Sequence, residues 1–398
     1  MKIDHIHFFV EDAAYQRNWF VTRLGWTFVK QATLPDRHLE VLRYRDTLFV
    51  LSSPRTSTSP VAQYLCTHGP GVADVAIEVE NLAVILRRLE HHPNPKPQAL
   101  DHGRRQNEPK TTTATVLSQL ASANNNAGNA DNHASNPPQI WTTIAGWGGL
   151  RHTLIERRPL ATSPPEGSGS RGLDHIVLNV PMGELQAAVT FYQTLFELQK
   201  QQSFNIQTKQ SGLGSQVLFA PASQLYFNIN QPTSANSQIQ TFLDANHGAG
   251  IQHIALHSEP IVPTVTALRQ RGVPLLSVPL AYYAQLKQRL QADRVDSVSP
   301  QEWQQIVKQQ ILIDWQPQKT RALLLQIFSQ PIFQAPTFFL SLLSVAGRFR
   351  ALVRATFWPF TKPLKQRCKG SASPGETYHD PANTPQRLPL GWQTAAVF

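Results

Sequence analysis

The stretch GLDHIVLNV at residues 172–180 decides how the rest of this chain is interpreted, because β-branched residues and Leu surround a single histidine, His175. The stretch GIQHIALH at residues 250–257 repeats the pattern around His253. Such composition is typical of buried β-strands, and a histidine within one projects from a single face. We therefore predict two core strands, each carrying one histidine.

Both stretches have counterparts in the first half of the chain. IDHIHFFV at residues 3–10 resembles residues 173–180, and GVADVAIEV at residues 71–79 resembles residues 250–257. An amphipathic segment follows the first strand of each copy, with large apolar residues at helical spacing: Tyr15, Trp19 and Phe20, then Leu185, Val189, Tyr192 and Phe196. Self-similarity over a long period indicates a duplicated unit. The order strand, helix, strands, strand, helix, strands in each half predicts an α+β fold with mostly antiparallel sheets.

The two copies differ at the second histidine, because Asp74 occupies the position that matches His253. A lone histidine on a strand is more often a packed or surface residue than a metal ligand. Two histidines at repeat-equivalent positions favour a shared site, since two His and one carboxylate hold Fe(II) and leave three coordination positions open. We expect a structural first half and a functional second half, with structural roles for His5, His7, His152 and His257.

The charge of the chain is concentrated at its C-terminal end. The chain has 398 residues, 41% of them hydrophobic, and a formal charge of +10, values that fit a soluble protein of two or three domains. A basic excess can indicate nucleic acid or a membrane surface as partner. No acidic residue lies between Asp314 and Glu376, however, and that interval holds Arg348, Arg350, Arg354, Lys362, Lys365, Arg367 and Lys369. The excess belongs to this tail, so we expect no nucleic-acid partner.

Cysteine usage and the N-terminus favour the cytoplasm. Cys66 and Cys368 are the only cysteines, and no apolar signal-peptide core follows Met1. A Pro/Gly/Ser-rich segment at residues 161–171 is typical of a linker, and a stretch rich in Ala, Ser, Asn and Thr at about residues 91–138 indicates a disordered insertion. The expected domains are therefore residues 1–160 and 172–339.

Four further stretches carry a resemblance to a known family. They are GGLRHTL at residues 148–154, NHGAGIQHIAL at 246–256, LLSVP at 275–279 with Tyr282 and Tyr283 beyond, and LLQIF at 324–328. From residue 1 to about Phe339, the insertion excepted, the chain resembles the 4-hydroxyphenylpyruvate dioxygenases of the vicinal oxygen chelate superfamily. The resemblance implies two vicinal-oxygen-chelate domains, each of paired βαβββ modules that form a curved, mostly antiparallel sheet.

The resemblance also implies an Fe(II)-dependent reaction of 4-hydroxyphenylpyruvate with O₂ that gives homogentisate and CO₂, a step of tyrosine catabolism. The partners would be an aromatic 2-oxo acid and O₂, with no membrane and with a homo-oligomer as an open alternative. The implied iron ligands are His175 and His253, the implied catalytic residues are Gln238, Gln252 and Gln326, and the implied substrate-binding residues are Ser215, Asn230, Phe328 and Phe339.

Other interpretations of these residues stay open. Without the family, Ser215 and Asn230 would be a strand hydroxyl and a turn residue, and Gln238 and Gln326 would be solvent-facing amides. Phe328 and Phe339 would be core residues, which is compatible with lining a pocket. A hydroxymandelate synthase would use the same substrate and metal. A non-catalytic binding protein of the same fold is the alternative from a different class.

The family pattern breaks at Ser341. In the family a Pro-Thr-aromatic stretch leads to a glutamate ligand, whereas here PTFFL at residues 336–340 is followed by Ser341, and a neutral hydroxyl is a poor substitute for a carboxylate on Fe(II). Codons allowed for Leu340 and Ser341 contain GAG, a Glu codon, in a shifted frame. Read in that frame, residues 350–365 can give Gly-Phe-Gly-Ser-Gly-Asn-Phe-Leu-Ala-Leu-Tyr-Glu-Ala-Ile-Glu, the family segment that follows.

We therefore hypothesise that the reading frame slips near Phe339. Residues 340–398 would then be an aberrant, basic and disordered tail. Residues 337–347 followed by Arg and Lys also resemble a short apolar anchor with a basic flank, but this run is too short to span a bilayer. The third iron ligand is thus expected to be missing from the chain as written.

Overall fold

The computed structural model describes residues 1–92, 99–104, 140–156, 172–207, 212–293, 298–315 and 323–346. The first half contains β1 (Lys2–Phe9), α1 (Ala13–Trp19), the π-helix η1 (Phe20–Leu24), β2 (Thr27–Thr33), β3 (Arg37–Tyr44), β4 (Thr47–Pro54), α2 (Pro60–His68), β5 (Gly71–Val79), α3 (Leu82–Glu90), β6 (Ala99–Arg104), β7 (Ile140–Ala145) and β8 (Arg151–Glu156). The second half contains β9 (Leu173–Asn179), α5 (Leu185–Phe196), β10 (Gln199–Gln207), β11 (Gly212–Ala220), β12 (Leu225–Pro232), α6 (Gln238–Ala245), β13 (Gly250–His257), α7 (Ile261–Gln270), α8 (Leu280–Ala292), α9 (Pro300–Lys308), β14 (Leu312–Trp315), β15 (Leu323–Phe328) and β16 (Phe339–Ala346).

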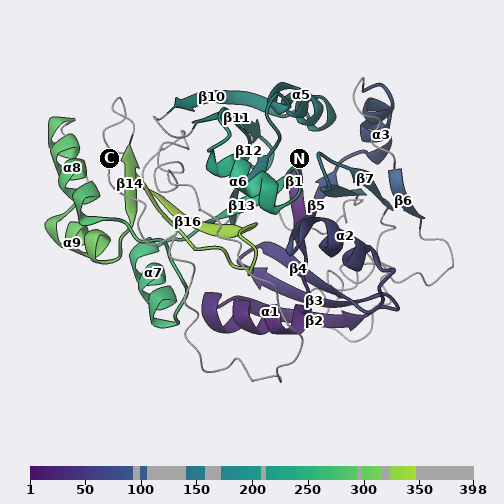
Figure 1. Cartoon of the computed structure of the whole chain (residues 1–398), viewed down its shortest axis with the longest axis horizontal. Coiled ribbons are helices and arrows are strands. Elements are labelled where there is room, and N and C mark those ends of the chain that lie inside the picture. Colours follow the sequence, from purple (N-terminus) through teal and green to yellow (C-terminus); the bar gives the residue numbers. More distant parts are fainter. Residues whose placement is uncertain are drawn as a thin grey trace, which may run out of the picture.

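The two halves repeat one strand arrangement. The first half runs β2-β3-β4-β1-β5-β8-β7-β6 and the second β10-β11-β12-β9-β13-β16-β15-β14. In both, the first strand pairs in parallel with the fourth and antiparallel with the fifth. The fifth strand pairs in parallel with the eighth. This repetition confirms the predicted duplication and the α+β class. The halves meet where β5 and β13 pair at Val72 and Ile251, which makes one curved, unclosed sheet (Figure 1).

Helices pack on both faces of the sheet, since α1 and α5 contact the face that carries Phe8 and Leu218, whereas α2 and α6 contact the face that carries Phe9 and Val217. In the first half, α1 begins at Asp12, whose carboxylate accepts a hydrogen bond from the Tyr15 N–H, and η1 ends at Gly25, whose φ of 77° is accessible to glycine without strain. Beneath these helices lie Phe8 and Phe49, both fully buried. In the second half α5 packs on β11 and β12. Strand residues alternate between faces, so the histidines point to the face opposite α1 and α5.

The halves are held together by buried contacts as well as by the shared sheet. His152 of β8 lies 2.9 Å from the hydroxyl of Tyr192 of α5. The hydroxyl of Tyr44 donates to the carbonyl of His257 across 2.6 Å. Apolar residues of both halves form one continuous core that includes Leu154 and Ile254. The relative position of the two halves is therefore determined by side chains as well as by backbone pairing.

Two expectations from the sequence are corrected. Residues 99–104, expected to belong to a disordered insertion, form β6 and pair with β7. Residues 340–346, expected to be a disordered tail, belong to β16 between β13 and β15, because the run Leu340–Ala346 is apolar enough for a buried strand in its present frame. The rest of the expected insertion, the linker at 161–171 and the tail at 347–398 lie outside the described residues.

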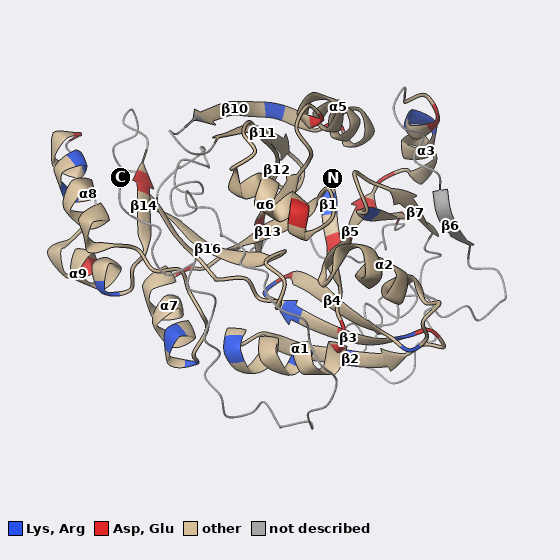
Figure 2. Cartoon of the chain, in the orientation of Figure 1, with Lys and Arg blue, Asp and Glu red and all other residues tan. Residues whose placement is uncertain are grey.

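Among the described residues, helices are too short or too polar to cross a bilayer. Lys and Arg are interspersed with Asp and Glu over the described helices and strands (Figure 2). The apolar run that suggested an anchor is instead part of the sheet.

Candidate metal and substrate site

The two predicted histidines lie side by side on neighbouring strands. His175 of β9 stands opposite Ala255, and His253 of β13 stands opposite Val177. Directly opposed residues of paired strands point to the same face. The two imidazole centroids are 5.5 Å apart, and the rings are 0% and 2% exposed. The sequence-based expectation that these side chains meet is confirmed.

Asp174 orients His175 from behind. One carboxylate oxygen of Asp174 lies 2.8 Å from His175 Nδ1, and the other lies 3.1 Å from His257 Nε2. Burial pushes the pKa of Asp174 upward, but the hydrogen bonds from His175 and His257 and the favourable electrostatic interaction with both rings hold this pKa well below its usual range. An ionised carboxylate only accepts, so His175 Nδ1 carries the hydrogen and Nε2 presents its lone pair to the site.

His253 is held in its neutral form. Burial, reinforced by the neighbouring His175, lowers the pKa of His253 well below its usual value. A neutral imidazole is the form that binds metals. Both ring nitrogens of His253 and Nε2 of His175 are buried with no hydrogen-bond partner among the described residues. Buried polar atoms are normally paired, so these nitrogens fit a metal ion as their partner.

Ser341 shares this face of the sheet with the two histidines. It stands opposite Ala255 of β13, which is itself opposite His175, so the three residues form a row across β9, β13 and β16. Ser341 is fully buried, and its Oγ accepts a hydrogen bond of 2.7 Å from Gln326 Nε2. Within the described residues there is no group of three His, Cys, Asp or Glu side chains that could hold a metal. Two donors therefore fit an iron(II) triad and the third does not.

Two phenylalanines pack against one side of the histidine pair. The ring of Phe339 stacks on His253, with centroids 4.7 Å apart and an angle of 17° between planes. Phe328 meets His253 edge to face at 6.2 Å. Both phenylalanines are buried, and by register they share the face of Ser341. This arrangement can hold an aromatic ring beside the histidines.

Polar side chains line the other side. Ser215 of β11 stands opposite Asn230 of β12, and the Asn230 amide donates to Asn179 Oδ1 across 3.3 Å. Ser215 Oγ, Asn230 Oδ1, Asn179 Nδ2 and Asn228 Oδ1 are buried without a hydrogen-bond partner among the described residues. Together they offer both donors and acceptors to a polar ligand. Sequence reasoning missed Asn179 and Asn228, which could have been found from their alternation with Asn230 and His175.

The remaining predicted residues are less closely tied to the histidines. Gln326 lies on the site face and contacts Ser341, and its Oε1 is unpaired among the described residues. Gln252 lies where the β9–β13 register is irregular. Gln238 is the half-buried first residue of α6, a helix that packs beside β12. Catalytic roles for all three stay predictions.

Asp174 is also a residue that sequence reasoning did not assign. The sequence signal that could have found it is the Asp-His pair, which is present in both copies. In the first copy, His5 Nδ1 lies 2.7 Å from Asp4 Oδ1, the same contact that His175 makes with Asp174. The other histidines make protein contacts: His7 Nε2 lies 2.7 Å from Ser52 Oγ, and His152 Nδ1 lies 3.0 Å from the Val75 carbonyl. In the first half, the Thr153 N–H donates a hydrogen bond to Asp74 across 2.9 Å. Asp74, the counterpart of His253, therefore has a hydrogen-bond partner within its own half.

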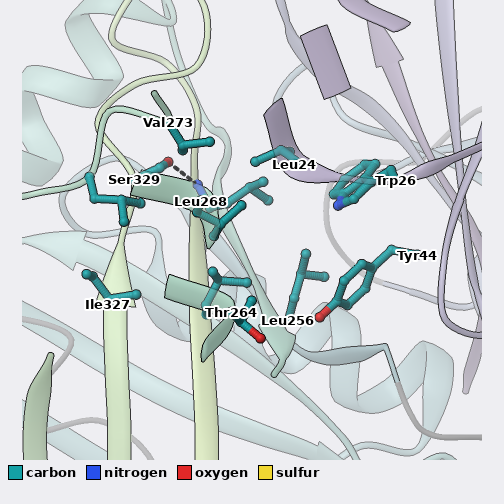
Figure 3. A pocket seen from close by; sticks show the side chains of 12 residues that line it. Leu24, Trp26, Tyr44, Leu256, Thr264, Leu268, Val273, Ile327 and Ser329 are labelled. Carbon is teal, nitrogen blue, oxygen red and sulfur yellow. Dashed lines mark hydrogen bonds between the residues drawn. The ribbon is translucent and has the colours of Figure 1, made fainter. Parts of the chain in front are cut away.

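A separate pocket lies on the opposite face of the sheet and differs from the histidine site in chemistry. Leu256, Leu340 and Leu342, which alternate with the site-facing residues, line it together with Trp26 and Tyr44 of the first half. Figure 3 shows mostly aliphatic and aromatic side chains converging there. It lacks a convergent set of polar groups, so the histidine site is the better candidate for chemistry.

Comparison with known proteins relates the fold to a superfamily. Residues 174–288 match the model of the Glyoxalase/Bleomycin resistance protein/Dioxygenase superfamily. A triple mutant of 4-hydroxymandelate synthase from Streptomyces coelicolor has the same fold, with a TM-score of 0.69 and 23% identity over 89% of this chain and 95% of that one. The chain thus has the vicinal oxygen chelate fold.

Full-length relatives narrow the assignment. An uncharacterised protein, slr0090 of Synechocystis, is 31% identical over 364 residues, covering 90% of this chain and 95% of that protein. The 4-hydroxyphenylpyruvate dioxygenase of Caenorhabditis briggsae is 28% identical over 387 residues, covering 88% of this chain and 90% of that protein. The chain belongs to the 4-hydroxyphenylpyruvate dioxygenase family.

Proposed function

We propose that the chain is built to convert 4-hydroxyphenylpyruvate and O₂ to homogentisate and CO₂ with Fe(II), in a catalytic domain of residues 172–339. The observation that carries the proposal is the buried pair of His175 and His253, since Nε2 of His175 and both ring nitrogens of His253 have no hydrogen-bond partner in the described part of the chain. Iron(II), when bound, would supply the oxygen chemistry. The proposal includes a cytoplasmic location.

The chain's own residues would bind and orient the substrate. Phe328 and Phe339 would hold the aromatic ring beside His253, since both rings already contact the imidazole. Ser215 and Asn230 would hydrogen-bond polar groups of the 2-oxo acid through oxygens that lack partners among the described residues. The burial of all four side chains would exclude water.

Ser341 limits this function in the chain as written. It is a neutral hydroxyl at the third ligand position, and two histidines alone hold a divalent metal weakly. We therefore expect little turnover from this chain and a gain of at least about tenfold from Ser341→Glu. O₂ uptake with 4-hydroxyphenylpyruvate, measured for this chain, for Ser341→Glu and for a chain with the shifted frame restored, tests the proposal.

Product analysis separates the closest alternative. A hydroxymandelate synthase would consume the same substrate but release hydroxymandelate, and the fold of such an enzyme matches this chain. Homogentisate from Ser341→Glu or the frame-restored chain supports the proposed reaction, and hydroxymandelate contradicts it. If all three chains are inert and bind no iron, the chain is a non-catalytic member of the family.

A further inference from the structure

The apolar pocket on the face opposite the histidines lies where the two halves of the chain pack together (Figure 3). The first half contributes Leu24 of η1 together with Trp26 and Tyr44, and the second half contributes residues of α7, β13, β15 and β16, among them Leu268 and Leu342. A π-helix such as η1 is rare and is frequent at functional sites. The pocket therefore depends on the arrangement of both halves and not on one half alone.

We propose that this pocket binds a small apolar molecule and that dioxygen is its natural occupant. The choice of dioxygen rests on the proposed function, because the proposed reaction consumes it. The pocket is distinct from the histidine site, since Leu256, Leu340 and Leu342 line it, whereas their neighbours Ala255 and Ser341 lie on the face of the histidines.

The first argument concerns hydrogen bonding, because the polar side chains of the lining are already engaged. The Tyr44 hydroxyl donates to a backbone carbonyl across 2.6 Å, and the Thr264 hydroxyl donates to another across 2.9 Å. Ser329 Oγ accepts from a backbone N–H across 2.9 Å. A buried water needs about two to four polar partners, so this lining suits water poorly. A molecule without hydrogen-bonding groups loses nothing on leaving water for such a pocket.

The second argument concerns size. The pocket has a volume of about 30 Å³. A dry protein cavity that holds benzene measures about 150 Å³ by comparison, and one water takes up about 30 Å³ of the liquid. The space therefore suits a molecule of one or two heavy atoms and excludes an aromatic ring or an acyl chain. Dioxygen fits this size and has no hydrogen-bonding group.

The third argument concerns the walls, which are held in place from outside the pocket. The Trp26 ring stacks on Phe20, with centroids 4.8 Å apart and an angle of 19° between planes, and its centroid lies 4.2 Å from that of Phe49. The Arg23 guanidinium donates to the carbonyl of Arg271, directly after α7, and so ties η1 to that helix. Protein interiors are close-packed, and walls fixed in this way cannot move together to fill the space.

The test uses the paramagnetism of dioxygen, which speeds the relaxation of methyl protons that it contacts. Methyl NMR spectra of the full chain are recorded under oxygen and under nitrogen at equal pressure. Methyl groups of Leu256, Ile327 and Leu342 should relax at least about threefold faster under oxygen than those of Leu39 and Val41, because burial of even a small apolar surface favours occupancy. Leu39 and Val41 are equally buried in a separate cluster of the first half.

Two results would overturn the proposal. One is an equal effect of oxygen on the lining methyl groups and on those of Leu39 and Val41. The other is magnetisation transfer from a bound water to the lining methyl groups, which would identify water as the occupant.

Three variants locate the effect in the pocket. Val273 lines the pocket, so Val273→Leu adds a methylene group there and should remove the excess relaxation. Val262→Leu adds the same group on α7 at a residue outside the lining and should behave like the parent. Leu268→Ala enlarges the pocket and should increase the excess. Excess relaxation that persists in a folded Val273→Leu chain, or that stays unchanged in Leu268→Ala, contradicts the proposal.

The outcomes separate this inference from the proposed function. If Ser341→Glu turns over 4-hydroxyphenylpyruvate while the lining methyl groups behave like those of Leu39, only the inference fails. If the lining methyl groups show the excess while Ser341→Glu is folded, as judged by tryptophan fluorescence on urea unfolding, and yet inert, the pocket stands as a site for a small apolar molecule. The proposed function, and with it the choice of dioxygen as natural occupant, then fails.

Discussion

At the residue scale, Asp174 determines which nitrogen of His175 faces the site. Its carboxylate accepts from both His175 and His257, and such carboxylate–histidine pairs set the orientation and basicity of metal-binding imidazoles. An asparagine could accept from one ring but would present an N–H to the other. In the Ser341→Glu background, Asp174→Asn should weaken Co(II) binding by about 10- to 100-fold in a calorimetric titration.

The repeat provides a matched control for that change. Asp4 makes the equivalent contact with His5 in the first half, at 2.7 Å. Asp4→Asn should therefore leave Co(II) affinity unchanged, as measured in the same calorimetric titration. Equal losses in the two variants would mean that the effect is general destabilisation and not orientation of a ligand.

Residue-level prediction from the sequence succeeded where a side chain is repeated and distinctive. His175 and His253 could be paired because their strands recur in both copies. The hydrogen bond between Ser341 and Gln326 could not be predicted, since it depends on the register of β15 against β16. Roles for Gln238 and Gln252 stay predictions for the same reason: sequence spacing does not say where a helix terminus or an irregular strand position points.

At the element scale, β16 is the strand whose existence the sequence analysis excluded. It lies between β13 and β15, and Leu343 is fully buried against Ala255 and Leu324. Leu343→Ala should lower the free energy of unfolding by about 2–5 kcal/mol through lost burial and a cavity. Urea unfolding followed by tryptophan fluorescence measures this loss.

Ser344→Ala is the control on the same strand. Ser344 is half-buried and points away from Leu343, so its removal should cost about 0.5 kcal/mol or less. A Leu343→Ala chain as stable as the parent would show that residues 340–346 do not form the strand. The expected disorder of residues 340–346 is wrong because an apolar segment can complete a sheet wherever the neighbouring strands offer unpaired backbone groups.

At the scale of the whole molecule, the packing of the halves makes stability depend on pH. His152 is fully buried between the Val75 carbonyl and the Tyr192 hydroxyl. Burial lowers its pKa, against the opposing effects of the Val75 carbonyl and the charge of Asp74. The unfolded chain therefore takes up a proton at this histidine below about pH 6.5, where the folded chain does not.

Stability should consequently fall as the pH drops below about 6.5, and this histidine should contribute up to about 1.4 kcal/mol per pH unit. Urea unfolding of the parent and of His152→Gln, at pH about 7.5 and about 5.5, measures the contribution. The variant is expected to be less stable at the higher pH and to lose less on acidification. Equal losses would contradict an uncharged His152 in the folded chain.

The sequence by itself determined the duplicated α+β architecture and the two histidine strands, because these follow from local patterns that repeat along the chain. Only the tertiary structure decided that Asp174 orients His175, that the polar residues of β11 and β12 share the histidine face, and that residues 340–346 complete the sheet. The physical reason is that neighbouring strands, which are distant in sequence, set the register of each strand and the face on which each side chain lies. Register and face then determine which side chains contact one another.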